Sequence, residues 1–244
     1  MKHAFFTCLA LCLLLLLPGG CSQQAAEDGA ADGGAALQEI LTIRDQAEEA
    51  YTAALAEIAP LEEEDPERFA EEMKRIKMER EGQYDVYTDK LVTHINNNTD
   101  DTEALKAYAD YLAKFVAPGY MTELGNYIKA VEVYDEALEY DPGNPEIQAL
   151  RDTAAELRFM SQERFDMVTK NMTFDEVEEL CGVANPKHII EEVKRGKTLT
   201  GWYYPREDRG IAGIFFMDGK VYKTDFDSKK APERRKAGEA KTEE

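Results

Sequence analysis

The sequence contains few of the residue types on which catalytic and metal sites depend. Its 244 residues include three histidines, one tryptophan and four cysteines, and three of those cysteines precede residue 22. A Ser-His-Asp order, a glycine-rich phosphate loop and an HExxH motif are all missing. We therefore expect that the chain is not an enzyme, that it has no catalytic residues, and that it binds no cofactor and no metal.

Long hydrophobic runs are also scarce. The run from Phe5 to Leu17 spans 13 residues, whereas a membrane-spanning helix needs about 20. Lys2 precedes this run, and the small residues Gly19 and Gly20 follow it. A short positive start, a short apolar core and small residues before a cleavage point are typical of a secretory signal peptide, which we predict over residues 1–20. A retained transmembrane helix is the alternative.

The residues that end this segment resemble the lipobox of bacterial lipoproteins. Gly19, Gly20 and Cys21 fit the pattern, whereas Pro18 stands where the family prefers leucine. The resemblance implies lipidation of Cys21 by a diacylglyceryl group and an amide-linked acyl chain. Because one acyl chain binds a membrane only marginally, several chains are expected to anchor the protein stably. Ser22 after the cysteine favours the outer membrane of the cell envelope, with the chain facing the periplasm.

Cys181 is the only cysteine left after the signal peptide and the lipidation site. It can form no intrachain disulfide, although the predicted compartment is oxidising. We interpret it as a small buried hydrophobic residue. The alternative, a catalytic thiol, needs a nearby histidine, for which His188 is the candidate.

Acidic residues are concentrated in one part of the chain. Residues 27–162 contain 32 acidic and 12 basic residues, whereas residues 163–227 contain 13 and 10. A strongly acidic body disfavours nucleic acid and anionic lipid surfaces as partners. A solvated helical surface is the plain interpretation, and a field that attracts a cationic partner or divalent ions is the alternative.

The region up to Val116 is predicted to be a linker followed by helices. Residues 21–36 are small and polar without apolar periodicity, which is typical of a flexible linker. Apolar residues then recur at steps of three and four. The predicted helices are 37–59, 66–80, 83–96 and 102–116. The second and third of these can alternatively form one kinked helix, and Ala117-Pro118-Gly119 is expected to break the fourth.

The stretch from Gly125 to Pro142 resembles the second half of a tetratricopeptide repeat. Such repeats carry Gly, aromatic, Ala, aromatic, Ala and Pro at fixed places. The matching residues are Gly125, Tyr127, Ala130, Tyr134, Ala137 and Pro142. Two further hairpins, 37–59 with 66–80 and 83–96 with 102–116, would complete a stack of repeats. An ordinary helical bundle with one repeat-like hairpin is the alternative.

After Phe165 the pattern changes from helices to strands. A capping box from Thr173 to Glu176 opens a short helix that ends at Gly182. Asn185-Pro186 is expected to open a second short helix that ends at Gly196. Alternating residues then predict three strands, and the last two are joined by an Asp218-Gly219 turn. The predicted strands are 198–204, 210–217 and 220–226.

These patterns predict a multidomain, mainly α fold. A helical-hairpin, tetratricopeptide-like body over residues 37–165 precedes a small α+β domain over residues 166–227, with two helices and a three-stranded antiparallel sheet. Residues 228–244 are charged, lack apolar anchors and are predicted to be disordered.

The order of motifs in the α+β domain resembles the SmpA/OmlA family of small outer-membrane lipoproteins, and its shape also resembles β-lactamase inhibitory modules. The matching stretches are Met172-Thr173, Trp202-Tyr203-Tyr204-Pro205, Phe215-Phe216 and Asp218-Gly219-Lys220-Val221. Both resemblances imply a protein-binding domain. The first also implies an accessory role in β-barrel assembly, although that family lacks a helical body.

The aromatic run at 202–204 supplies the candidate binding residues. By strand alternation, two of its three rings are expected to be in the core. Tyr, Trp and Arg are the usual anchors of protein interfaces. The candidate protein-binding residues are therefore Trp202, Tyr203, Arg206 and Arg209. His188 with Glu191 and Glu192 has helical metal-ligand spacing, but such residues on an exposed helix more often cap and solvate it. His94 is expected to be packed.

The expected function is a non-catalytic protein-protein interaction scaffold or adaptor, anchored to a membrane through lipid on Cys21. Its partners are expected to be envelope proteins and not nucleic acid. The alternative is an outer-membrane β-barrel assembly accessory, or an inhibitor of an envelope protein, that acts through the C-terminal sheet.

Overall fold

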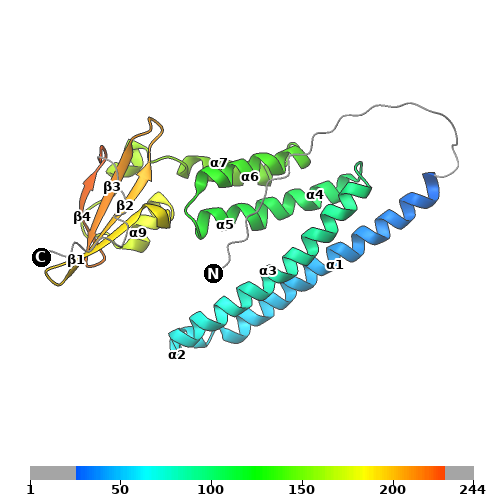
Figure 1. The fold of residues 1–244 in the computed structure, drawn as a ribbon, viewed down its shortest axis with the longest axis horizontal. Helices are drawn as coiled ribbons and strands as arrows, with labels where there is room; N and C mark the ends of the chain where they lie inside the picture. Colours follow the sequence, from blue (N-terminus) through cyan, green and yellow to red (C-terminus); the bar gives the residue numbers. More distant parts are fainter. Residues whose placement is uncertain (1–25, 229–244) are drawn as a thin grey trace, which may run out of the picture.

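The computed structural model describes residues 26–228, with side chains from Gly34 onward. The predicted signal peptide, the lipidation site Cys21 and the charged tail from Lys229 lie outside these residues. The chain forms a mainly helical body followed by a small sheet domain at one end of it (Figure 1). Within the described range, no helix is both long and apolar enough to cross a membrane.

The first two long helices run side by side as one hairpin. Helix α1 spans Ala26–Ile58, the single turn α2 spans Leu61–Glu64, and α3 spans Pro66–Asn97. Residues 26–36, expected to be part of a flexible linker, are therefore helical. Helix α3 is continuous, as in the alternative with one helix. Gly82 lies on its exposed side, and buried residues before and after Gly82 in the sequence pack against neighbouring helices.

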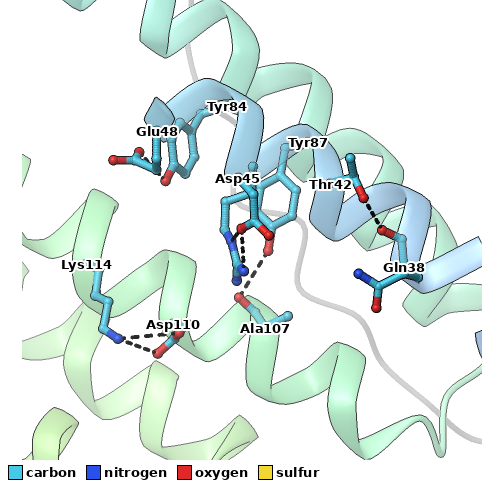
Figure 2. Close-up of polar contacts among 10 residues, drawn as sticks. Gln38, Thr42, Asp45, Glu48, Tyr84, Tyr87, Ala107, Asp110 and Lys114 are labelled. Atoms are coloured by element: carbon cyan, nitrogen blue, oxygen red, sulfur yellow. Dashed lines mark hydrogen bonds and ion pairs between the residues drawn. The ribbon is translucent and has the colours of Figure 1, made fainter. Parts of the chain in front are cut away.

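Polar and aromatic contacts connect this hairpin to the next helix. The carboxylate of Glu48 accepts hydrogen bonds from the Tyr84 hydroxyl at 2.6 Å and from Arg80 at 2.7 Å. The Tyr87 hydroxyl donates to the carbonyl of Ala107 at 3.4 Å, and Figure 2 shows Tyr84 and Tyr87 pointing to these partners. The Tyr84 ring also stacks on Phe115, with 4.1 Å between centroids.

The second part of the body contains five helical segments. They are α4 (Thr102–Tyr111), the π-helix η1 (Leu112–Val116), α5 (Ala117–Thr122), α6 (Tyr127–Tyr140) and α7 (Pro145–Leu157). The expected break at Ala117-Pro118-Gly119 is wrong. The π-helix changes the hydrogen-bonding pattern just before Pro118, which then lies in the first turn of α5, where its missing N–H costs nothing.

Three of the repeat-like residues pack inside the helical body. Ala130, Tyr134 and Ala137 are almost fully buried between α4–η1 and α7, where small side chains allow the helices to approach closely. Pro142 follows the last residue of α6 and its cap. The helices of the two predicted hairpins do lie together, because α1 packs along α3 and the later part of α3 contacts α4 and η1. Helix α6 packs against α4, α5 and α7.

The C-terminal domain is an antiparallel sheet with short helices. The helices are α8 (Gln162–Asp166), α9 (Phe174–Cys181) and the 3₁₀ turn η2 (Pro186–His188). The strands are β1 (Ile189–Lys194), β2 (Lys197–Pro205), β3 (Ile211–Met217) and β4 (Lys220–Asp225). They lie in the order β1-β2-β3-β4, so the sheet has four strands and not the expected three.

The extra strand replaces the second predicted helix. Arg195 and Gly196 have φ values of +52° and +76°, which fits the two-residue turns that join neighbouring antiparallel strands. This turn folds β1 back on β2, where Ile190 pairs with Gly201 and Val193 with Thr198. The β-branched residues of 189–193 favour an extended chain over a helix.

The core of the sheet domain begins before the expected boundary at residue 166. Met160 and Phe165 are buried with Trp202, Ile214 and other residues of the inner sheet face. The capping box of α9 is present as predicted, and Gly182 ends that helix at φ +80°. The Asp218-Gly219 turn also lies where it was predicted.

Candidate protein-binding groove

A groove of about 430 Å³ lies where β2 and β3 meet their connecting loop. Its walls are mainly aromatic and aliphatic, and they come from β2, the start of β3 and the segment after α7. The apolar lining residues are Phe159, Tyr203, Tyr204, Pro205 and Ile211. Side chains that can carry charge surround them: His188, Arg206, Glu207 and Arg209. Three of the four predicted binding residues thus line one groove.

The alternation of β2 explains why Tyr203 reaches the groove and Trp202 does not. Trp202 points into the core, where its ring lies 4.9 Å from Phe174 and 4.6 Å from Phe216, centroid to centroid. It cannot act as a surface anchor. Tyr203 points to the opposite face, where its ring covers Gly201 and meets Phe215 edge-on at 5.8 Å.

Arg206 holds the β2–β3 loop in place. Its guanidinium donates to the carbonyl of Phe226 at 2.8 Å, forms ion pairs with Asp208 and Asp227, and lies 4.0 Å above the Phe226 ring. Only 14% of its side chain is exposed. Arg206 therefore shapes the groove, and its charge is compensated within the chain.

Arg209 is held differently, at the tip of the same loop. Its φ of +67° is in the left-handed region that favours glycine, and its backbone N–H donates to the carbonyl of Arg206 at 3.1 Å. Among the described residues, its guanidinium has no ion pair and no hydrogen bond. Its charge is thus available at the edge of the groove.

Tyr127 and Gly125 connect the helical body to the sheet domain. The Tyr127 hydroxyl accepts a hydrogen bond from the N–H of Val183 at 2.8 Å, and a Cβ on Gly125 would lie 2.5 Å from the Val183 carbonyl oxygen. From the sheet side, the Tyr204 hydroxyl donates to the carbonyl of Gly182 at 3.1 Å. Both tyrosines therefore hold the 182–183 segment, which lies between the body and the groove.

Sequence reasoning missed this junction. Gly125 and Tyr127 match the repeat pattern, so they were assigned to packing between helices. The available signal was Gly182 after the α9 capping box, because a glycine at φ +80° leaves room for the Tyr127 ring. Within the sheet domain, the N–H of Met160 donates to the carbonyl of Pro205 at 2.8 Å and holds the start of the domain to β2.

The other candidate residues, Cys181 and His188 with Glu191 and Glu192, lie in surroundings that do not suit a reactive thiol or a helical metal site. Cys181 is buried as predicted, and burial raises the pKa of its thiol to about 11, which suppresses the reactive thiolate. His188 lies in a 3₁₀ turn and Glu191 and Glu192 in a strand, so their helical spacing is lost. No group of three His, Cys, Asp or Glu residues within 26–228 could hold a metal ion.

No protein-family model, no curated protein and no solved structure matches this chain. The resemblances to bacterial lipoproteins, tetratricopeptide repeats and the SmpA/OmlA family therefore stay predictions. What the chain does must be argued from its own groove and junction.

Proposed function

We propose that this chain is a membrane-anchored envelope lipoprotein that acts as a non-catalytic scaffold or adaptor for other envelope proteins. Its anchor is the lipid predicted on Cys21, and its binding element is the sheet-domain groove.

The observation that supports this proposal is the convergence of Tyr203, Arg206 and Arg209 on one largely apolar groove. Aromatic and arginine side chains around an apolar depression are the usual anchors of a protein interface. The junction at Tyr127 adds a second argument, because it connects the groove to the helical body and so to the anchored end of the chain.

A crosslinking pull-down from intact envelopes tests this function. Wild type, Cys21→Ala and a chain lacking residues 159–244 would each carry the same affinity tag. We expect wild type to capture a specific envelope protein, and the truncated chain to lose it. If no variant captures any protein above an untagged control, the adaptor function is wrong.

The alternative function is a β-barrel assembly accessory or an inhibitor of an envelope protein, with the helices serving only as a spacer. The aromatic pair Tyr203 and Phe215 on the outer sheet face favours it, since this face could also bind a partner. A pull-down with the isolated 158–228 segment, added to the variants above, separates the two. Capture of outer-membrane barrel proteins or their assembly factors by the isolated 158–228 segment supports the alternative, whereas a requirement for the helical body supports the adaptor.

A further inference from the structure

Two arginines beside the groove lack an acidic partner. Arg158 caps the end of α7, its guanidinium lies 4.7 Å from the centroid of the Phe159 ring, and its Nε is buried without a hydrogen-bond partner. Arg209 lines the groove from the β2–β3 loop, whereas Arg158 adjoins the lining residue Phe159. Neither guanidinium forms an ion pair with any residue of the described chain.

The chain has a formal net charge of −20, and half of its described arginines form ion pairs with carboxylates. Arg44, Arg75, Arg80 and Arg151 all pair with carboxylates at distances of 2.7 to 2.9 Å. In the groove, Arg206 is compensated by Asp208 and Asp227. The buried Nε of Arg158 lacks an acceptor, which is costly unless a carboxylate or another acceptor completes it.

The backbone conformation of Arg209 also indicates a binding role. A left-handed φ is unfavourable for a non-glycine residue, and glycine would avoid that strain. The Arg209 side chain has no acidic partner within the described chain, so its backbone hydrogen bond to Arg206 is the contact that offsets this strain. Strained residues of this kind are concentrated at binding and catalytic sites.

We propose that the groove binds an extended acidic segment of a partner protein. One large apolar side chain of that segment would lie between Phe159, Tyr203 and Ile211, and its neighbouring carboxylates would bind Arg158 and Arg209. The groove volume of about 430 Å³ is within the range of small binding sites. This inference rests on the adaptor function and specifies the chemistry of the partner.

Selection from a random peptide library displayed on phage tests the proposal. The target is the chain from residue 21 onward with Cys21→Ser, which is not lipidated. We expect enriched peptides that combine Asp or Glu with Phe, Leu, Ile or Trp. Binding of a synthetic copy of the best peptide, measured by fluorescence anisotropy, should weaken roughly tenfold in Arg209→Gly and in Arg158→Met. Methionine keeps an apolar side chain on Phe159 and removes the charge.

Arg195→Gly is the matched control. Arg195 is also an exposed arginine at positive φ, but it lies in the β1–β2 turn, at the other end of β1 from His188. Its loss removes the same charge and the same strain, so peptide binding should not change. Thermal unfolding should show that Arg209→Gly is at least as stable as wild type, which separates lost binding from lost folding.

Three outcomes would overturn the inference: no enrichment, enrichment of basic or uncharged peptides, or equal binding by wild type and Arg209→Gly. The envelope pull-down separates this failure from failure of the adaptor function. If Arg209→Gly captures the same envelope protein as wild type, the adaptor function holds and its partner binds elsewhere. If wild type captures nothing, the adaptor function itself fails.

Discussion

At the scale of single residues, similar side chains contribute very differently to the stability of the fold because their surroundings differ. Tyr127 and Tyr134 lie two turns apart on α6 and both match the repeat pattern. The Tyr127 hydroxyl accepts from a backbone N–H at 2.8 Å, whereas the Tyr134 hydroxyl meets only the sulfur of Met121 at 3.9 Å. Burial raises the pKa of both hydroxyls, so both are neutral at physiological pH.

The first prediction concerns this pair. Tyr127→Phe leaves the N–H of Val183 without its acceptor, so we expect the free energy of unfolding to fall by about 1–2 kcal/mol in urea titrations. Tyr134→Phe removes only a weak contact, and a change of about 0.5 kcal/mol or less is expected. Equal effects of the two substitutions would contradict the role given to Tyr127.

The second prediction is a pH dependence at Asp101. The His94 imidazole, 2.8 Å away, and the first N–H groups of α4 hydrogen-bond to this carboxylate, and they lower its pKa below the ordinary 3.8. A depressed pKa stabilises the fold above the unfolded value, and this stabilisation is lost as the pH falls through the folded value.

Asp101→Asn tests it, because asparagine also caps helices but cannot ionise. We expect the variant to be less stable than wild type at pH 6, and the difference to shrink as the pH falls below about 4. Urea unfolding at each pH measures this difference. A difference that does not depend on pH would show that the ionised carboxylate adds nothing.

At the scale of elements, close approach of two backbones decides where the domains meet. Gly125 precedes α6 at φ +51°, and a Cβ there would lie within 2.8 Å of three backbone atoms of residues 183–185. Gly143, after α6, has φ +82° but nothing within 4 Å of its Cβ position. The two glycines therefore share the conformational requirement but not the contact.

The third prediction compares Gly125→Ala with Gly143→Ala. The Gly143 variant should lose about 1 kcal/mol through its left-handed backbone alone. The Gly125 variant should lose at least about 2 kcal/mol more, because the clash involves backbone atoms that cannot rotate away. Thermal unfolding of both variants measures the difference. Similar losses would mean that the junction accommodates the added Cβ without a further loss of stability.

At the scale of the whole molecule, the sheet domain has a core of its own that begins near Met160. Met160 and Phe165 are buried in it, and the Phe165 ring meets Phe226 at 5.2 Å. No residue of that core belongs to the two clusters of buried side chains in the helical body. The junction therefore joins two separately packed units.

The fourth prediction follows from this boundary. A fragment of residues 158–228 should fold cooperatively, whereas residues 167–228 should not. The shorter fragment loses two buried apolar side chains worth about 1.5–3 kcal/mol each, and a domain of this size is only marginally stable. Circular dichroism with urea titration distinguishes the fragments. Equal stability would place the boundary after α8.

Sequence alone determined the features that depend on neighbouring residues. The repeat pattern predicted α6, the capping box predicted the start of α9, and the Asp218-Gly219 turn predicted the hairpin of β3 and β4. In each case a few residues suffice, because the interactions that fix these elements lie within one turn or one strand. Alternation along β2 predicted two buried rings among residues 202–204, whereas the structure buries all three.

Only the tertiary structure decided the rest, because the deciding contacts join distant parts of the chain. Pairing with β2 made a strand of 189–194, and a π-helix carried the chain past Pro118. The assignment of Tyr127 to the domain junction depends on Val183, which no local pattern indicates. The groove likewise exists only because folding brings Phe159 beside Tyr203 and Arg209, so the binding site could be predicted in part and its shape could not.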